Sequence, residues 1–215
     1  MPQLRSPRIW GTFCASGGVG STTLSLHLAR VAADRGLHVL LIETDITAPL
    51  REILGGVPPF WEEYQAETTI SSSAMPRSCA AGFSLLTRKT TSHIPLEVFV
   101  DVISVASEHF ELIIIDNPIS GMSEINSILV VENSLPSLIG LNTFTRTTTP
   151  DIVIVNKFSP LLKKKAAIEG FITDATTFRI PQSKDLQLAL GFGINYKLIK
   201  RNRALLEEIL TEMLP

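Results

Sequence analysis

Cysteine, tryptophan and tyrosine are rare in this sequence, with two residues of each among 215. The two cysteines, Cys14 and Cys79, belong to no CxxC motif or Cys/His cluster, so we expect no zinc site and a reducing, cytoplasmic setting. No apolar run approaches the roughly 20 residues that span a bilayer, and the first residues lack the apolar stretch of a signal peptide. We therefore predict a cytoplasmic protein that is at most attached to the inner face of a membrane.

An excess of charge of one sign is also absent. The 19 basic and 21 acidic residues give a net charge of −2. This total does not favour a general nucleic-acid binder, although it leaves room for local basic clusters. Apolar residues make up 45% of the chain and charged residues 19%, which is enough to bury a large core. We expect a single domain over residues 1–215, without repeats or an interdomain linker.

Short apolar runs alternate with stretches of helical periodicity along the chain. The predicted strands cover residues 9–15, 38–42, 82–86, 111–116, 128–131 and 152–155. The predicted helices are one that ends near Gly36, one opened by Pro95, one that starts at Ser134 and one over residues 196–214. This alternation predicts an α/β fold with a mostly parallel, twisted sheet and helices on both faces, which binds ligands at the carboxyl ends of its strands.

Two regions allow finer predictions. In the helix after Pro95, the expected apolar stripe consists of Leu96, Phe99, Val100 and Ile103. Residues 56–80, which hold prolines and a serine run, have no regular pattern, and we expect them to form an irregular surface excursion.

A glycine-rich turn follows the first strand and precedes the first helix. Glycines let backbone N–H groups wrap a phosphate, and a helix start adds unpaired N–H donors and a positive dipole end. The ordinary phosphate-loop pattern requires glycine at position 15 and lysine at position 21, where Ala15 and Ser21 stand instead. The candidate nucleotide-binding residues of this turn are Gly17, Gly18, Val19, Gly20, Ser21, Thr22 and Thr23.

Polar residues also end several later strands. The second predicted strand is followed by Glu43-Thr44-Asp45, the run Leu-Ile-Ile-Ile ends in Asp116, and the strand over residues 152–155 is followed by Asn156. An Ile-Pro pair ends at Pro181. A parallel sheet binds ligands at the carboxyl ends of its strands, and a family resemblance implies that these residues belong to one site. Two of these elements also have a structural interpretation: Glu43-Thr44-Asp45 as a cap on the following turn, and the glycine-rich turn as a turn without a ligand.

Taken in order, these elements resemble the ParA/MinD family of ATPases, whose phosphate loop reads KGGxGK[ST]. In this sequence Ser16 and Ser21 stand where that loop has its two lysines. The resemblance implies that the chain binds ATP and Mg²⁺ and forms a homodimer. In the family, the first lysine of the loop reaches across the dimer interface. The second lysine of the family holds the β- and γ-phosphates.

The resemblance also implies roles for single residues. The hydroxyl of Thr22 would bind Mg²⁺, and Asp116 would hold the metal through water. Asp45 would orient the attacking water and contact the metal shell, as the only catalytic candidate. Asn156 would read the adenine edge, with Pro181 beside the base.

The form GGVG-S-[ST]-T, with serine at position 21, resembles the TadZ/CpaE branch, which is linked to the assembly and polar placement of Flp-type (Tad) pili. Relatives in that branch often carry a receiver-like N-terminal domain and the first lysine, and this sequence has neither feature. Without the lysines, we expect ATP binding with slow or absent hydrolysis, in a scaffold that positions a pilus or secretion machine near the membrane or a cell pole.

Three other functions stay open. An active partitioning ATPase, cycling on DNA or a membrane, requires loop lysines and a basic surface. A pseudo-ATPase would act through protein contacts alone. A biosynthetic enzyme of the dethiobiotin synthetase type shares the fold but needs the loop lysine.

Several further residues have simple structural interpretations. We expect His27 to be solvated, Cys14 to be buried rather than reactive, and the lysines at 163–165 to form a solvated face. The aromatic residues Trp61 and Tyr64 are candidates for a contact surface. The apolar stripe of the last helix is expected to pack on the core rather than on a membrane.

Overall fold

The computed structural model describes residues 8–56, 58–65, 70, 75–76, 78–79, 81–119, 125–158, 175–186 and 198–214. Within this part of the chain, seven strands form one sheet in the order β3-β2-β4-β1-β5-β6-β7, and all neighbouring strands are parallel. The strands are β1 (Arg8–Cys14), β2 (Val39–Glu43), β3 (Ser84–Leu86), β4 (Leu112–Asp116), β5 (Asn126–Glu132), β6 (Ile152–Phe158) and β7 (Thr176–Pro181). The predicted α/β fold with a parallel sheet is confirmed, and β7 is a strand that the sequence pattern did not predict.

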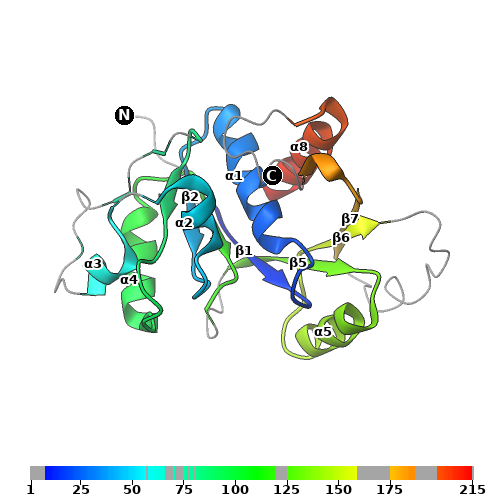
Figure 1. Cartoon of the computed structure of the whole chain (residues 1–215), viewed down its shortest axis with the longest axis horizontal. Helices are drawn as coiled ribbons and strands as arrows, with labels where there is room; N and C mark the ends of the chain where they lie inside the picture. The colour runs from blue at the N-terminus through cyan, green and yellow to red at the C-terminus, as the bar shows by residue number, and fades with distance from the viewer. Residues whose placement is uncertain are drawn as a thin grey trace.

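The described helices lie on both faces of this sheet, as Figure 1 shows for α1 and α8 on one side and α5 on the other. They are α1 (Ser21–Asp34), α2 (Pro49–Leu54), α3 (Trp61–Gln65), α4 (Leu96–Ala106), α5 (Leu135–Thr145) and α8 (Lys200–Met213). None of the helices in the described ranges is long and apolar enough to cross a membrane. The lysines at 163–165 and the first residues of the predicted last helix, 196–197, lie outside the described residues.

Alternate residues of the central strands supply the cores on the two faces. Leu112 and Ile114 of β4 join the cluster under α1 and α8, whereas Ile113 and Ile115 join the cluster under α3 and α4. A third cluster packs Leu129 and its neighbours under α5. Every residue of β4 is buried, and each of its four apolar side chains contributes roughly 1.5–3 kcal/mol of transfer free energy. The two-sided burial explains why the strand is a continuous apolar run.

The last helix packs on the core, as predicted. The side chains of Leu206, Ile209, Leu210 and Met213 are buried in the same cluster as α1. The indole N–H of Trp10, on β1, donates a hydrogen bond to the backbone oxygen of Met213 at 3.2 Å. The apolar stripe of α8 therefore joins the interior of the sheet.

The stripe predicted for α4 was partly wrong. Phe99 and Ile103 are buried as expected, but Leu96 and Val100 are exposed. Val102 and Ala106 are buried in their place. The buried stripe therefore lies three residues further along the helix than predicted. Phe99 and Ile103 fit both stripes, because residues spaced by three and four along an apolar helix can belong to either of two neighbouring faces.

The aromatic pair in the excursion is not a contact surface, and that interpretation was wrong. Trp61 and Tyr64, in α3, are both buried. The Trp61 ring stacks on Phe99 with 5.2 Å between ring centroids, and its indole N–H donates to the backbone oxygen of Glu43 at 3.1 Å. The part of residues 56–80 that the structure describes therefore includes core residues that cover the end of β2.

Helix α5 touches the start of the glycine-rich turn at one glycine. A Cβ atom added to Gly140 would lie 1.7 Å from the backbone oxygen of Ala15. Only the missing side chain lets the helix backbone approach the turn this closely. The position of α5 thus depends on glycine at this place in the helix.

The substitution Gly140→Ala should destabilise the protein, although alanine favours a helix more than glycine does. The clash is with backbone, so α5 must move, and we expect a loss of about 1–3 kcal/mol in the free energy of unfolding. Chemical denaturation measures this change. The exposed Asn142 of the same helix is the control site, and Asn142→Ala should leave stability unchanged or slightly higher. Equal stability of the two variants would contradict the close contact.

Candidate functional site

The turn between β1 and α1 is an open backbone cradle. Gly18 and Gly20 have φ angles of 75° and 96°, a left-handed conformation that glycine adopts without strain. A Cβ atom on Gly17 or Gly18 would meet nothing within 4 Å. Helix α1 starts at Ser21 without a hydrogen bond from a capping side chain. Its first amide groups are therefore free to bind an anion.

A buried carboxylate lies beside the start of α1. One oxygen of Asp116, Oδ1, accepts hydrogen bonds from Ser25 Oγ at 3.0 Å and Thr12 Oγ1 at 3.3 Å. Within the described residues, its other oxygen, Oδ2, is buried without a hydrogen-bond partner. Leaving such an oxygen unpaired costs free energy, and a water of a magnesium shell would satisfy it. The residues at this point therefore fit Mg²⁺ and a phosphate.

The environment of Asp116 acts on its pKa in two directions. Burial is the largest influence and raises the pKa above its ordinary value. The hydroxyl groups of Thr22 and Ser25 lower it, and the charge of Asp45 raises it slightly. The net shift is upward, so this carboxylate lacks a counter-charge that a bound cation would provide.

Glu43 is a structural residue in this arrangement. Its buried carboxylate accepts hydrogen bonds from the backbone N–H groups of Leu50 and Arg51 and from the hydroxyl of Thr87. Burial raises its pKa, and these three hydrogen bonds oppose that shift. The carboxylate thus caps α2, which agrees with the interpretation of the strand end as a turn cap.

Asp45 lies two residues beyond Glu43 and is partly exposed. Its Oδ1 accepts hydrogen bonds from the backbone N–H and the hydroxyl of Thr47, both at 2.8 Å. These contacts form a local side-chain turn. Asp45 is close enough to Asp116 to influence its pKa, which places both predicted acidic residues on the same side of the site.

Two neighbouring residues of β6 hold the turn from the other side. The amide nitrogen of Asn156 donates to the backbone oxygen of Val19 at 2.6 Å. The ammonium of Lys157 donates to the backbone oxygen of Gly18 at 2.5 Å and pairs with Glu132 at 3.1 Å. The sequence pattern singled out Asn156 but missed Lys157, which no motif or spacing distinguishes from an ordinary surface lysine.

A cavity of about 200 Å³ opens between the turn, α1 and the ends of β6 and β7. Its lining residues are Gly18, Gly20, Thr23, Leu24, His27, Asn156, Lys157, Ile180, Ser183, Leu186 and Leu206. Four of the predicted site residues therefore share this cavity, whereas Asp45, Asp116 and Pro181 do not line it. The structure thus places Asn156 and three residues of the turn at the cavity, and the two acidic residues outside it.

His27 is buried in the cavity wall, so the prediction of a solvated side chain was wrong. It is 2% exposed, and its Nε2 lies 3.5 Å from the backbone oxygen of Leu186. Among the described residues, Nδ1 has no partner. Burial lowers the pKa of His27 to about 4, so the ring is neutral at pH 7. The residue shares a helical face with Leu24 and Leu28, and packing of α8 and residues 183–186 covers that face.

Cys14 ends β1 and is exposed, so the prediction of burial was also wrong. Partial burial of the thiol and the nearby charge of Asp116 raise its pKa, which disfavours the reactive thiolate.

Ser16, at the first lysine position of the resembled loop, is held within its own chain. Its hydroxyl lies 2.9 Å from that of Ser137 on α5. The Ser137 hydroxyl also accepts from the backbone N–H of Glu132 at 3.2 Å. The serine therefore links the turn to α5 and β5.

The profile of the CobQ/CobB/MinD/ParA nucleotide binding domain matches residues 13–195 of this sequence. The chain belongs to this family. The match includes the glycine-rich turn, both predicted acidic residues, Asn156 and Pro181. A comparison with curated proteins found no significant match.

Solved structures with the same fold cover nearly the whole chain. A Borrelia burgdorferi B31 protein assigned to plasmid partition, bound to AMPPNP, has 19% identity and a TM-score of 0.78 and covers 97% of this chain and 98% of its own. The MinC:MinD cell division complex of Aquifex aeolicus has 18% identity, a TM-score of 0.72 and coverage of 97% and 98%. The MinD protein of Pyrococcus horikoshii OT3, complexed with Mg-ADP, has 19% identity, a TM-score of 0.69 and coverage of 94% and 96%. This member of the CobQ/CobB/MinD/ParA family thus has the ParA/MinD-like fold.

The buried histidine predicts a pH dependence of stability. The pKa of His27 is about 4 in the folded protein against an ordinary value of 6.5, so the unfolded chain binds more protons between these values. The free energy of unfolding therefore falls as the pH drops through this window, by up to about 1.4 kcal/mol per pH unit.

The substitution His27→Gln should remove this contribution. Chemical denaturation at several pH values between 6.5 and 4 measures the difference in slope between the variant and the original protein. The control is His109→Gln, because His109 is exposed. Parallel pH profiles for all three proteins would show that His27 is not buried in its neutral form.

Proposed function

We propose that this protein binds ATP with Mg²⁺ at the turn 16–23. The proposal depends on one observation, an open backbone cradle of glycines beside Oδ2 of Asp116, which has no hydrogen-bond partner in the described part of the chain. The amide groups from Gly17 to Thr23 would hold the phosphates. The neighbouring cavity would receive the remainder of the nucleotide, with Asn156 and the Ile180-Pro181 segment on the side of the base.

Mg²⁺ would be held at the start of α1 by the Thr22 hydroxyl and, through water, by Asp116 and Asp45. When bound, Mg²⁺ would neutralise part of the phosphate charge. The raised pKa of Asp116 supports this placement, since a cation would stabilise the ionised carboxylate. Among the described residues, no cluster of three or more His, Cys, Asp or Glu could hold a metal alone, so the phosphates themselves would complete the metal shell.

Hydrolysis would be slow or absent because serine occupies both lysine positions of the loop. A charged hydrogen bond to phosphate contributes roughly 1.5–3 kcal/mol, so each lost contact weakens binding by about ten- to hundred-fold. Turnover depends still more on positive charge near the transferred phosphoryl group. Asp45 would orient the water in whatever hydrolysis remains.

The biological role we propose is that of a scaffold, which positions a pilus or secretion machine at the cytoplasmic face of the membrane or at a cell pole. The serine at position 21 and its resemblance to the TadZ/CpaE loop support this role. The exposed side chains of Leu135 and Ile139, one helical turn apart on α5, supply an apolar surface for protein contacts. We infer a homodimer that contacts further protein components.

A second candidate, a pseudo-ATPase that acts only through protein contacts, is favoured by the internal bonds of the turn. Ser16 bonds to Ser137, and Asn156 bonds to the Val19 carbonyl. These contacts hold the turn without a nucleotide. Binding measurements separate this candidate from the first.

Calorimetric titration with ATP or ADP, with and without Mg²⁺, tests the binding proposal. We expect micromolar-range affinity that depends on Mg²⁺. Because Asp116→Asn removes the carboxylate charge, it should abolish most of the magnesium dependence. The control is Asp101→Asn on the exposed face of α4, which should bind as the original protein does. Absence of heat and of any thermal shift at millimolar nucleotide would favour the pseudo-ATPase.

Phosphate release from purified protein with Mg-ATP tests the turnover proposal. We expect a rate far below one per minute, since neither loop lysine is present. Asp45→Ala measures what the acidic residue contributes to any residual rate. Rapid hydrolysis that Asp45→Ala abolishes would contradict the scaffold proposal and support an active partitioning ATPase.

A further inference from the structure

Lys157 occupies an irregular point of the sheet. The pairing of β6 with β7 shifts register between Val155 and Phe158, and Lys157 has a φ angle of 53°. This left-handed conformation costs a lysine roughly 1–3 kcal/mol. Bulges of this kind change the direction of a side chain and are frequent next to functional sites. The strained backbone at this bulge thus sets the direction of the Lys157 side chain and, with it, the position of the ammonium.

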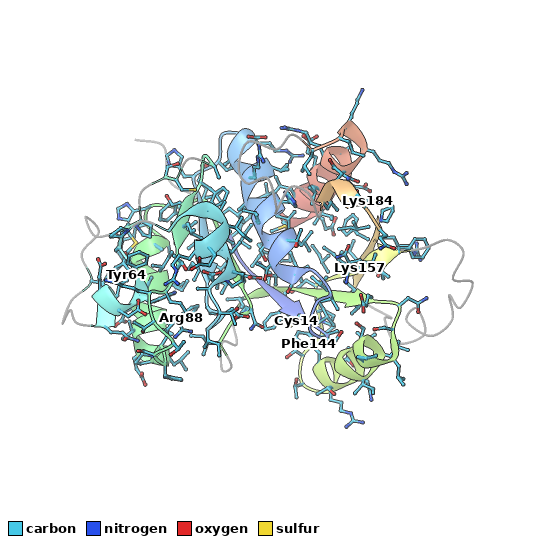
Figure 2. All side chains as sticks on the ribbon, in the orientation of Figure 1. Cys14, Tyr64, Arg88, Phe144, Lys157 and Lys184 are labelled. Carbon is cyan, nitrogen blue, oxygen red and sulfur yellow. The ribbon has the colours of Figure 1, made fainter. Side chains whose placement is uncertain are left out.

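That ammonium lies at the rim of the cradle. It is 2.5 Å from the backbone oxygen of Gly18, in the middle of the turn, and 3.1 Å from Glu132 Oε2. Figure 2 labels Lys157 at the end of β6, below Lys184 in this view. Among the described residues that line the cavity, Lys157 is the one lysine or arginine. The lysine is only partly exposed and its ammonium pairs with Glu132. It is therefore held at the site rather than freely solvated.

The turn itself provides no ammonium. Both of its lysine positions are serine, and Ser16 is bonded to Ser137. An anion in the backbone cradle would therefore find its nearest described ammonium on β6. Phosphate oxygens accept stronger hydrogen bonds from an ammonium than a neutral carbonyl does. A phosphate group would compete with the Gly18 carbonyl for the same donor.

We propose that Lys157 is a phosphate-binding residue that supplies, from β6 of the same chain, the positive charge missing from the glycine-rich turn. This inference rests on the proposed nucleotide binding. In the absence of an anion, Glu132 and the Gly18 carbonyl hold the ammonium in place. When nucleotide binds, the ammonium moves from the Gly18 carbonyl to a phosphate oxygen, while Glu132 limits the strength of that contact.

Titration with Mg-ATP tests this assignment, because two substitutions should change the dissociation constant in opposite directions. Lys157→Met should raise the dissociation constant by about ten- to hundred-fold, because a charged hydrogen bond is lost. Glu132→Gln should lower it severalfold, because it releases the ammonium from its ion pair. Lys184→Met is the matched control, since Lys184 is exposed nearby and should leave affinity unchanged.

Two further variants separate charge from support of the turn. Lys157→Gln retains a donor for the Gly18 carbonyl but lacks the charge, so it should bind weakly and lose part of the salt dependence of binding. Adding Ser21→Lys to Lys157→Met should restore affinity. Thermal melting of each variant identifies loss of folding, and a folded Lys157→Gln that binds weakly supports the charge role.

The outcomes separate this assignment from the proposed function. If the original protein binds Mg-ATP and both Lys157 variants bind equally well, the assignment is wrong and the proposed function stands. If Lys157→Met weakens binding but Lys157→Gln does not, the residue only supports the turn and the assignment is wrong. If the original protein does not bind Mg-ATP, the proposed function fails and the assignment fails with it.

Discussion

A strand that is covered on both faces must be apolar along its length, and this constraint places the polar chemistry of the molecule at the strand ends. Four strands finish in this way, with Glu43, Asp116, Glu132 and Asn156 at or near their carboxyl ends. The sheet register pairs Glu43 with Asp116 and Glu132 with Asn156. The parallel sheet thus aligns these side chains along one edge. Asp116, Glu132 and Asn156 lie there beside the turn and the start of α1, whereas Glu43 caps α2.

The turn is fixed by its neighbours rather than by residues of its own. Helix α5 approaches it at Gly140, and strand β6 bonds to the carbonyls of Gly18 and Val19. These contacts use carbonyl oxygens and the Ser16 hydroxyl, so the amide groups of the turn stay available. A cradle held in this manner needs little rearrangement when it receives an anion, which reduces the entropy cost of binding.

The sequence predicted the sheet because continuous apolar runs and their polar ends are local signals, as in the run that ends at Asp116. It failed where burial depends on distant packing. His27 is buried because α8 and residues 183–186 cover its face of α1, and Trp61 is buried because Phe99 lies beneath it. Lys157 could not be recognised, since its direction comes from a bulge between β6 and β7 that no residue pattern reveals.

The two tryptophans lie in different cores, on opposite faces of the sheet. Trp10 belongs to the cluster under α1 and α8 and bonds to the last turn of α8, whereas Trp61 belongs to the cluster under α3 and α4. With no third tryptophan in the chain, each indole is an intrinsic fluorophore for one layer. Replacing either with phenylalanine leaves a single emitter, so the opening of one layer can be followed spectroscopically without a label.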